Sequence, residues 1–329
     1  MKQTVTCCRL HPSSFILPKS FILSMKGSPF TKVCQGLAAV RDRRRADLHT
    51  HTTFSDGTYT PADVVHRARA AGLKAVAITD HDTLGGIEPA RAAANGQLEV
   101  IAGVEITAEF RGSELHLLGY FVRTDDPALV AALAELRAAR RDRLVEIARR
   151  LKPLGASVEE DVAAISEYVS VGRRHLAHIL MARGYSHSRH HAFTRWLADP
   201  AIVAVPKRRI AVADAIGLVR KAGGVTSWAH PPANTDLATM SELHGLGLQA
   251  VECVYPWPTG AHGRRLRAMA ETLGLATTGG SDSHDPSPPT RAVGARTVSL
   301  DEVARIREMS GQCSVVSGQP VGSPRPLPG

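Results

Sequence analysis

Nine histidine, aspartate and glutamate residues stand at or near the ends of short apolar runs in this 329-residue chain. Several of these runs have the length and composition of buried strands, and helical stretches separate them. In α/β folds the carboxyl ends of the strands meet at one crevice, so polar residues that follow the strands converge there. The nine residues are His49, His51, Asp56, His81, Glu105, His116, His230, Asp282 and His284. The pattern therefore predicts an α/β fold that collects these side chains in one place.

A set made only of imidazole and carboxylate groups is typical of zinc, manganese or iron sites and argues against thiolate ligation. Nine ligands are too many for one ion and enough for two or three. His49 and His51 are two residues apart, as are Asp282 and His284, so each pair shares one face of a strand. A single histidine at a strand end is more often a hydrogen-bonded core residue or a helix cap. The complete set favours a metal centre, and the usual use of such a centre is phosphate ester hydrolysis.

The net charge of +9 is concentrated at the N-terminus, because residues 1–45 hold nine Lys/Arg residues and one acidic residue. The remaining 284 residues carry 31 basic and 30 acidic groups, which argues against broad nucleic-acid binding by the folded body. The acid-poor leader 1–45 resembles an organelle transit peptide or untranslated upstream sequence, and we expect it to be poorly ordered. No apolar run reaches 18 residues, so no membrane span is expected. Five cysteines without a CxxC pair favour a reducing, cytoplasmic location.

Local patterns predict the elements and their order. A helix is expected at 61–71, with Thr60 as N-cap, Pro61 in the first turn and Gly72 as its end. Strands that alternate with helices predict a parallel sheet, and closure into a barrel is one arrangement of it. Residues 126–215 are rich in helical pattern and are expected to form an insertion between barrel parts 46–125 and 216–310. The tail 311–329 is expected to be disordered. The predicted strands are 46–52, 74–79, 98–107, 115–122, 224–228, 249–254 and 276–279.

The order of these motifs over about residues 46–300 resembles the polymerase and histidinol phosphatase (PHP) superfamily. The resemblance implies a distorted seven-stranded (β/α) barrel, ligation of a trinuclear cluster by the nine residues, and a metal-activated water as nucleophile. Manganese is the first choice of ion, with zinc or iron as alternatives. The chain is most similar to the branch that contains 3′,5′-nucleoside bisphosphate phosphatases and ribonuclease AM. Two segments carry that likeness, Gly172-Arg173-Arg174-His175 and Val205-Pro206-Lys207, although the first has arginine where the branch has proline.

This likeness implies a hydrolase that removes the 3′-phosphate of 3′,5′-nucleoside bisphosphates, shortens 5′-phosphorylated RNA from its 5′ end, or does both. The implied partner is a small nucleotide or a short RNA, and Arg173, His175 and Lys207 are the implied substrate contacts. A solvated helix start is the alternative for Arg173. The alternatives for function are a histidinol-phosphatase-like phosphomonoesterase and a non-catalytic PHP module. Trp257 is either a platform for a base or an ordinary loop anchor.

Two further residues flank His81 and leave alternatives open. Asp80 or Asp82 can orient an imidazole from outside the ligand set. Alternatively, Asp82 caps the helix that follows. The stretch Arg140-Arg141-x-Arg143 is predicted to be a solvated helix side.

Overall fold

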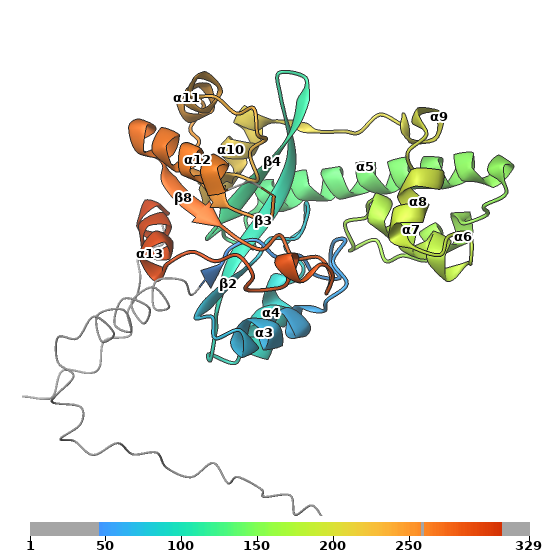
Figure 1. Ribbon diagram of the computed structural model, residues 1–329, viewed down its shortest axis with the longest axis horizontal. Coiled ribbons are helices and arrows are strands. Elements are labelled where there is room, and N and C mark those ends of the chain that lie inside the picture. Colours follow the sequence, from blue (N-terminus) through green and yellow to red (C-terminus); the bar gives the residue numbers. More distant parts are fainter. Residues whose placement is uncertain (1–45, 258–259, 311–329) are drawn as a thin grey trace, which may run out of the picture. The chain divides into compact units, whose positions relative to one another are not determined.

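The computed structural model describes residues 46–257 and 260–310 (Figure 1). The predicted leader and tail lie outside the described residues. None of the described helices combines the length and apolarity that a membrane crossing requires.

Seven strands form one twisted sheet in the order β1-β2-β3-β4-β6-β7-β8, and the short β5 pairs with β3 at the side. Strand β4 runs antiparallel to both neighbours, β3 and β6, whereas all the other pairs are parallel. The sheet is therefore parallel, as expected, except at β4. The reason is local, because β3 and β4 are joined by the tight turn Arg111-Gly112 and form a hairpin instead of a βαβ unit. The strands are β1 Ala46–Asp47, β2 Ala75–Ile78, β3 Glu99–Phe110, β4 Ser113–Tyr120, β5 Ile210–Ala211, β6 Val225–Trp228, β7 Ala250–Val254 and β8 Ala276–Gly279.

The first and last strands meet and nearly close the sheet into a barrel. The backbone N–H of Leu48 donates to the carbonyl of Gly279 over 3.2 Å, and His51 N donates to Ser283 O over 2.9 Å. Gly280 permits this approach, since a Cβ there would lie 2.3 Å from the backbone nitrogen of His49. The absence of a side chain at Gly280 thus allows the seam between β1 and β8 to form.

Alternate residues of the strands enter two different apolar clusters, as the two faces of a strand require. In β2, Ala75 and Ala77 belong to the inner cluster, while Val76 and Ile78 pack against the helices outside. Alanines are repeated at the inner positions of β1, β7 and β8 as well. Small side chains suit the narrow interior of a barrel, so this alternation selects a closed sheet.

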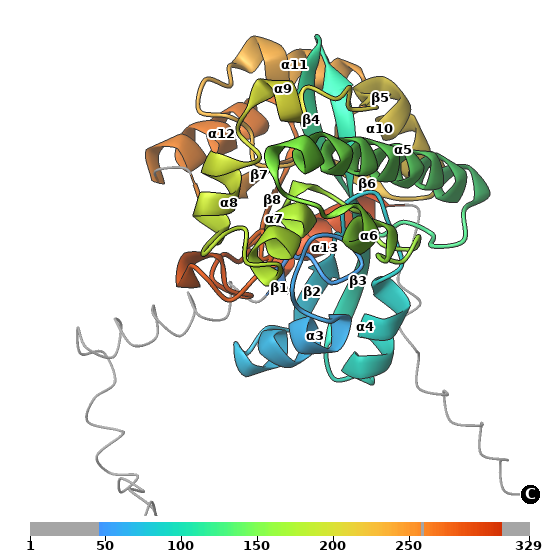
Figure 2. The same ribbon diagram turned by 90° about the vertical axis from the view of Figure 1, so that its right-hand side faces the viewer.

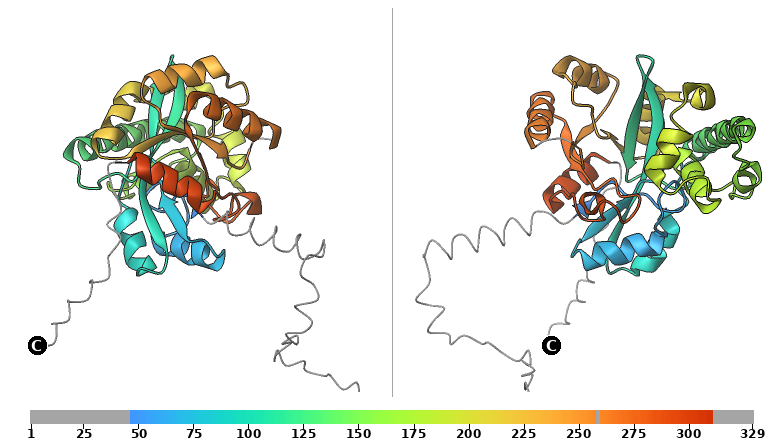
Figure 3. Two further views of the ribbon diagram at one scale, coloured as in Figure 1. Left: turned by 90° about the vertical axis from the view of Figure 1, so that its left-hand side faces the viewer. Right: turned by 45° about the vertical axis from the view of Figure 1, so that its right-hand side comes forward.

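Helices cover the outer face of the barrel. The predicted helix at 61–71 is confirmed as α3, where Thr60 and Asp63 form a capping box and Pro61 opens the first turn. Helix α12 contacts β7 and β8, whereas α13 contacts β6 and β8 (orange and red in Figure 3). Val303 and Ile306 of α13 pack in the inner cluster. The helices around the barrel are α3 Pro61–Ala70, α4 Ile87–Ala94, α10 Val212–Lys221, α11 Leu237–Gly245, α12 Gly260–Leu273 and α13 Leu300–Met309.

Five helices between β4 and β5 have an apolar cluster of their own. The long helix α5 connects this cluster to the barrel, because Leu129 and Leu133 pack in the outer barrel cluster while Leu144 and Ile147 pack in the separate one. Figure 2 shows α7 and α8 in front of the strands, and Figure 1 shows α6–α9 at the far end of α5. Strand β5 and the first turn of α10 fall within the range predicted for the insertion, yet they pack with the barrel. The five helices are α5 Pro127–Leu151, α6 Glu159–Ala163, α7 Arg173–Ala182, α8 Arg189–Arg195 and α9 Pro200–Val203.

Candidate metal centre

The buried carboxylate of Glu105 is the centre on which five of the predicted histidines converge. Glu105 lies on β3 and is 1% exposed. Its two oxygens lie 2.9–3.2 Å from five ring nitrogens that come from four different segments of the chain. These nitrogens belong to His49, His51, His81, His116 and His230. Residues 181 positions apart in the sequence are thereby brought to one carboxylate.

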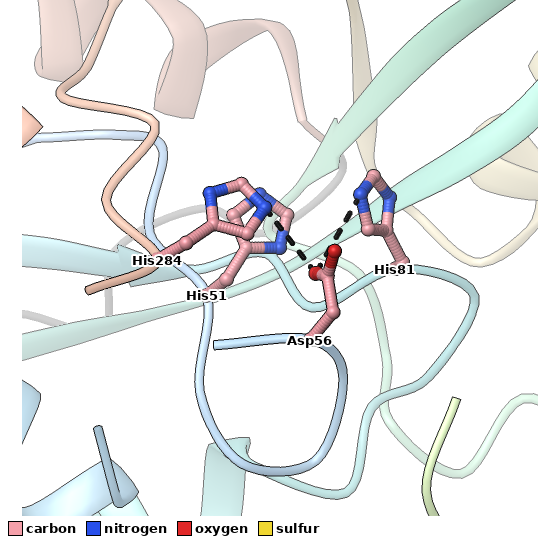
Figure 4. A group of neighbouring side chains, drawn as sticks. All are labelled: His51, Asp56, His81 and His284. Carbon is pink, nitrogen blue, oxygen red and sulfur yellow. Dashed lines mark ion pairs between the residues drawn. The ribbon is translucent and has the colours of Figure 1, made fainter. Parts of the chain in front are cut away.

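The remaining predicted ligands, Asp56, Asp282 and His284, complete the cluster on its open side. Asp282 Oδ1 lies 3.4 Å from both His51 Nε2 and His284 Nδ1. Asp56 Oδ1 lies 3.2 Å from His284 Nε2 and 3.9 Å from His81 Nε2, as the dashed lines in Figure 4 show. All nine predicted residues therefore lie together in the structure.

Several ligand atoms of the cluster are buried and have no hydrogen-bond partner of good geometry, although they lie within ion-pair distance of one another. Two ligand atoms that each lie ~2.1 Å from a shared ion are roughly 3–3.5 Å apart, which matches the separations around Glu105. Unsatisfied buried polar atoms are rare in folded proteins, and a divalent cation between them would satisfy them. The atoms concerned are His49 Nε2, His51 Nε2, Asp56 Oδ1, His81 Nδ1 and Glu105 Oε2. The donor set thus fits divalent metal ions.

Glu252, a residue that the sequence reasoning missed, supports two of the histidines from behind. It lies on β7 and is fully buried. One carboxylate oxygen lies 3.1 Å from His49 Nδ1, and the other accepts from the backbone N–H of His230 over 2.7 Å. A carboxylate at Nδ1 places the proton on that nitrogen and leaves Nε2 free to face Glu105. A charged residue inside the apolar run 249–254 was the sequence signal for it.

The two aspartates that flank His81 have different roles from the predicted ones. Asp80 accepts from the backbone and hydroxyl of Thr52 and from Ser55 Oγ, all within 2.7 Å, and so holds the loop that carries Asp56. It reaches His51 only through Ser55, whose Oγ lies 3.4 Å from His51 Nδ1. Asp82 caps no helix. Its oxygens accept from the backbone N–H of Thr107 and from Arg140.

Two predicted ligands adopt a strained backbone conformation. His230 has φ 32° and Asp282 has φ 47°, in a region that residues with a Cβ rarely occupy. Such conformations cost on the order of 1–3 kcal/mol each and persist where the surroundings hold them. Here the bond from His230 N to Glu252 and the pairing of Asp282 with Arg291 hold the two segments.

The electrostatics of the cluster reflect its burial and its mutual contacts. Burial lowers the pKa of His81 well below its ordinary value. Burial has the same tendency in His51 and His116, but contacts with Glu105, and with Asp282 in the case of His51, outweigh it and raise the pKa of each to about 9. In Asp282, burial alone would raise the pKa, and the neighbouring His284 and His49 lower it instead. Metal binding to such imidazoles therefore releases protons, which makes it dependent on pH.

A cavity of about 410 Å³ opens from the cluster toward the helical insertion. Six cationic side chains line it, two of them, Arg174 and Arg291, beside the predicted ligands Asp56 and Asp282. The other four are Arg140, Arg143, Arg173 and Lys207. Arg173, at the start of α7, has no ion-pair partner among residues 46–257 and 260–310 and is exposed to solvent. Lys207 donates to Glu114 over 2.7 Å, and Glu114 in turn lies 3.0 Å from His116 Nε2. An anionic ligand at the metal cluster would meet these cations.

The structure places the other predicted substrate contact differently. His175 Nδ1 accepts from the backbone N–H of Gly172 over 3.1 Å and so stabilises the first turn of α7, and His175 is absent from the residues that line the cavity. This bond lets the helix begin at Arg173 although the chain has Arg174 where the resembling branch has proline. Arg174 itself reaches over the cluster, with Nη2 at 2.5 Å from Asp285 and Nε at 3.6 Å from Asp56.

The prediction that the stretch from Arg140 to Arg143 is a solvated helix side was wrong. Arg140 donates to Asp82 over 2.6 Å and to Thr107 Oγ1 over 2.6 Å, and its side chain is only 13% exposed. Arg143 donates to the carbonyls of Val203 and Val205, both over 3.0 Å. No local spacing reveals these partners, because they lie between 33 and 62 residues away.

A nearly closed α/β barrel with clustered imidazoles and carboxylates is typical of metal-dependent hydrolases, and the cationic cavity beside the cluster suits phosphate esters. Comparison with known proteins agrees with this class. The PHP domain matches residues 47–180 of the chain. A 5′-3′ exoribonuclease of Haemophilus influenzae is 31% identical over 252 residues, which cover 74% of this chain and 91% of that protein. The chain belongs to the PHP family.

Two further relatives place the chain more closely. A 3′,5′-nucleoside bisphosphate phosphatase of Chromobacterium violaceum is 30% identical over 271 residues, which cover 79% of this chain and 93% of that protein. A solved structure from Bifidobacterium adolescentis, assigned as a metal-dependent phosphoesterase, has a TM-score of 0.75 at 29% identity and covers 84% of this chain and 99% of that one. The protein is a PHP-type metal-dependent phosphoesterase and thus a hydrolase of phosphate ester bonds.

Proposed function

We propose that this enzyme hydrolyses the 3′-phosphate ester of 3′,5′-nucleoside bisphosphates, shortens 5′-phosphorylated RNA from its 5′ end, or does both. The observation that carries this proposal is the continuity of the cavity, which has the metal cluster on one side and Arg143, Arg173 and Lys207 on the other. A substrate with two phosphate groups can occupy both sides at once. The names of the Haemophilus and Chromobacterium relatives support the same two substrate classes.

The nine clustered residues are proposed to hold two or three divalent ions, manganese first, although sites of this composition also accept zinc or iron. When bound, these ions supply positive charge for the phosphoryl oxygens and an activated water for the attack. Glu105 faces five histidines and would hold the ions together with them. Glu252 fixes the tautomer of His49, so that Nε2 presents its lone pair to the cluster.

The substrate contacts are proposed for Arg173 and Lys207, while the contact predicted for His175 is an indirect one through the helix start. A guanidinium group binds two phosphate oxygens at once, and Arg173 has no competing carboxylate among the described residues. Lys207 shares its charge with Glu114, and burial lowers the pKa of the Lys207 ammonium. The neighbouring groove of Val203, Val205, Lys207 and Arg209 continues away from the metal cluster and can take the next phosphate of an RNA strand. A cytoplasmic location stays a prediction.

Phosphate release from 3′-phosphoadenosine 5′-phosphate, histidinol phosphate and a 5′-phosphorylated oligoribonucleotide, with manganese present, tests the proposal. We expect turnover of the first substrate, the third, or both, and loss of that turnover in His49→Ala. Preference for histidinol phosphate would favour the histidinol-phosphatase alternative. Metal binding without release from any of the three compounds would favour a non-catalytic module.

A second arm tests the cationic side of the cavity. Arg173→Ala is expected to raise KM for the bisphosphate by tenfold to about a hundredfold, because a hydrogen bond to a charged group contributes ~1.5–3 kcal/mol. The same variant should have little effect on adenosine 3′-monophosphate, which lacks the 5′-phosphate. Arg208→Ala is the matched control, since Arg208 pairs with the exposed Glu135 and lies outside the cavity. Equal effects of both variants would refute the assignment of Arg173.

A further inference from the structure

A second hollow, of about 290 Å³, adjoins the metal cluster at His230, and neither Lys207 nor Arg173 lines it. Its walls include Pro231, Pro232, Tyr255, Trp257 and His262, together with the predicted ligand His230. His230 and Trp257 line the larger cavity as well, so the two spaces adjoin each other. A group in this hollow is therefore in reach of the reacting phosphate.

The chemistry of these walls differs from that of the larger cavity. Neither an acidic nor a lysine or arginine side chain lines the hollow among the described residues, whereas cationic side chains line the larger cavity. A volume of about 300 Å³ with aromatic walls is at the lower end of small-ligand sites and suits a flat heterocycle. Proline and aromatic rings offer flat apolar surfaces for such a ring.

The walls are fixed in place before any ligand arrives. The Tyr255 hydroxyl donates to the carbonyl of Pro231, and His262 Nε2 donates to the same carbonyl over 3.2 Å. The rings of Tyr255 and His262 are nearly perpendicular, with centroids 6.5 Å apart. A preformed wall reduces the ordering that binding would otherwise require.

Trp257 is the exposed element of the hollow, with 69% of its surface accessible. The guanidinium carbon of Arg291 lies 4.4 Å from the centre of the indole ring, and Arg291 also pairs with Asp282. Arg291 lines the larger cavity and not the hollow, so the cation covers the indole from the metal side. Exposed apolar surface beside a cavity is typical of binding sites. A planar group that stacked on the indole of Trp257 would cover this surface.

We propose that this hollow binds the nucleobase of the substrate, with Trp257 as the stacking surface. The inference rests on the proposed function, because it adds a binding site for the base to the sites proposed for the two phosphates of the substrate. The cations hold the distal phosphate, the metal cluster holds the scissile phosphate, and the aromatic hollow holds the base. Substrates without a base lose this contact.

Fluorescence of the full-length protein tests the site without any turnover. The chain has three tryptophans, and Trp196 and Trp228 are only 9% and 5% exposed, so a ligand-induced change reports mainly on Trp257. Adenosine 5′-monophosphate is expected to quench the emission with saturation, whereas ribose 5-phosphate leaves it unchanged. Trp257→Phe should remove the change. An unchanged emission at nucleotide concentrations where equilibrium dialysis shows binding would overturn the proposal.

Turnover gives an independent test. We would compare kcat/KM for adenosine 3′,5′-bisphosphate with that for the same bisphosphate carrying a tetrahydrofuran ring without a base. Base stacking on an aromatic side chain contributes a factor of roughly five to one hundred. In the wild type, kcat/KM for the substrate with a base should therefore be higher by about that factor than kcat/KM for the substrate without one. Trp257→Ala should lower the ratio of the two kcat/KM values, and Trp257→Phe should retain most of it.

Tyr168→Ala is the matched control, since Tyr168 is also 69% exposed and lies outside both spaces. It should leave the ratio of the two substrates unchanged. A Trp257→Ala variant that lowers kcat/KM equally for both substrates, with an unchanged melting temperature, would refute the base site. If no phosphate ester is hydrolysed at all, the proposed function fails instead, and the fluorescence result still decides whether a base binds.

Discussion

Glu252→Gln is expected to weaken metal binding by one to two orders of magnitude while leaving the fold intact. The fully buried carboxylate accepts from His49 Nδ1 with one oxygen and from the His230 backbone N–H with the other. Glutamine offers only one acceptor atom, so one of these two donors would face an NH2 group in either orientation of the amide. If His49 Nδ1 loses its acceptor, its tautomer is no longer fixed, and Nε2 is a poorer ligand.

The magnitude follows from the two bonds. Loss of a group that orients a ligating histidine typically reduces metal affinity 10–100-fold, which corresponds to ~1.4–2.8 kcal/mol at 1.4 kcal/mol for each factor of ten. If His230 N loses its partner instead, a buried donor without an acceptor costs ~1–3 kcal/mol. Loss of this bond would also remove a contact that holds the strained backbone of His230, whose φ is 32°.

The assay is a manganese titration of the metal-free protein by calorimetry, with a chelator competition to reach the tighter site. Glu302→Gln serves as the matched control, because Glu302 is a partly buried glutamate that accepts from Thr277 and Arg267 far from the cluster. We expect weaker binding only in Glu252→Gln. Equal manganese affinity in Glu252→Gln and the wild type, with both proteins folded, would refute the role of Glu252 in orienting His49.

Three further perturbations test the forces around the cluster. Arg140→Ala leaves the buried Asp82 carboxylate without its charged partner. The free energy of unfolding, measured in urea, should therefore fall by about 3–5 kcal/mol. Arg149 is exposed and serves as the control, so a similar loss in Arg149→Ala would contradict this explanation. Asp47→Asn should lower the free energy of unfolding by ~2 kcal/mol. The Asp47 carboxylate accepts from three backbone N–H groups, whereas an amide can accept with only one atom. An unchanged urea midpoint would count against this explanation. Removal of metal by a chelator should lower the melting temperature by about 10 °C, since ions at ~1,000 times their Kd contribute about 4 kcal/mol; a melting temperature independent of manganese concentration would exclude a stabilising site.

The sequence was sufficient for those parts of the fold in which local pattern and tertiary structure agree. The helix at Pro61 was found because its capping residues are adjacent in sequence. Helix α13 carries an equally readable capping box, Ser299 with Glu302, and could have been predicted from it. The direction of β4 could not be read from its own apolar pattern, since parallel and antiparallel strands share a period of two. It depends on the turn before it.

The site divides in the same way. Most of the predicted ligands follow strands, so topology brings them together, whereas Glu105 and His116 lie within β3 and β4. The residue types of all nine suit the chemistry of the ions. Glu252 left a weaker signal, a single charge in an apolar strand. Arg140 and Asp82 left none, because their pairing joins an insertion helix to the loop after β2 and depends on how α5 is placed.

The placement of α5 connects the two halves of the site. Its first turns pack in the barrel cluster and its last turns pack with the insertion helices, so it has two fixed ends. Between them, Arg140 binds Asp82, the residue next to His81, while Arg143 holds the backbone of residues 203–205, just before Lys207. The loop that carries a proposed metal ligand and the segment that carries a proposed phosphate contact are therefore held by two arginines three residues apart on one helix. The same helix thus couples the loop that carries His81 to the segment that carries Lys207, so a shift of α5 would move both.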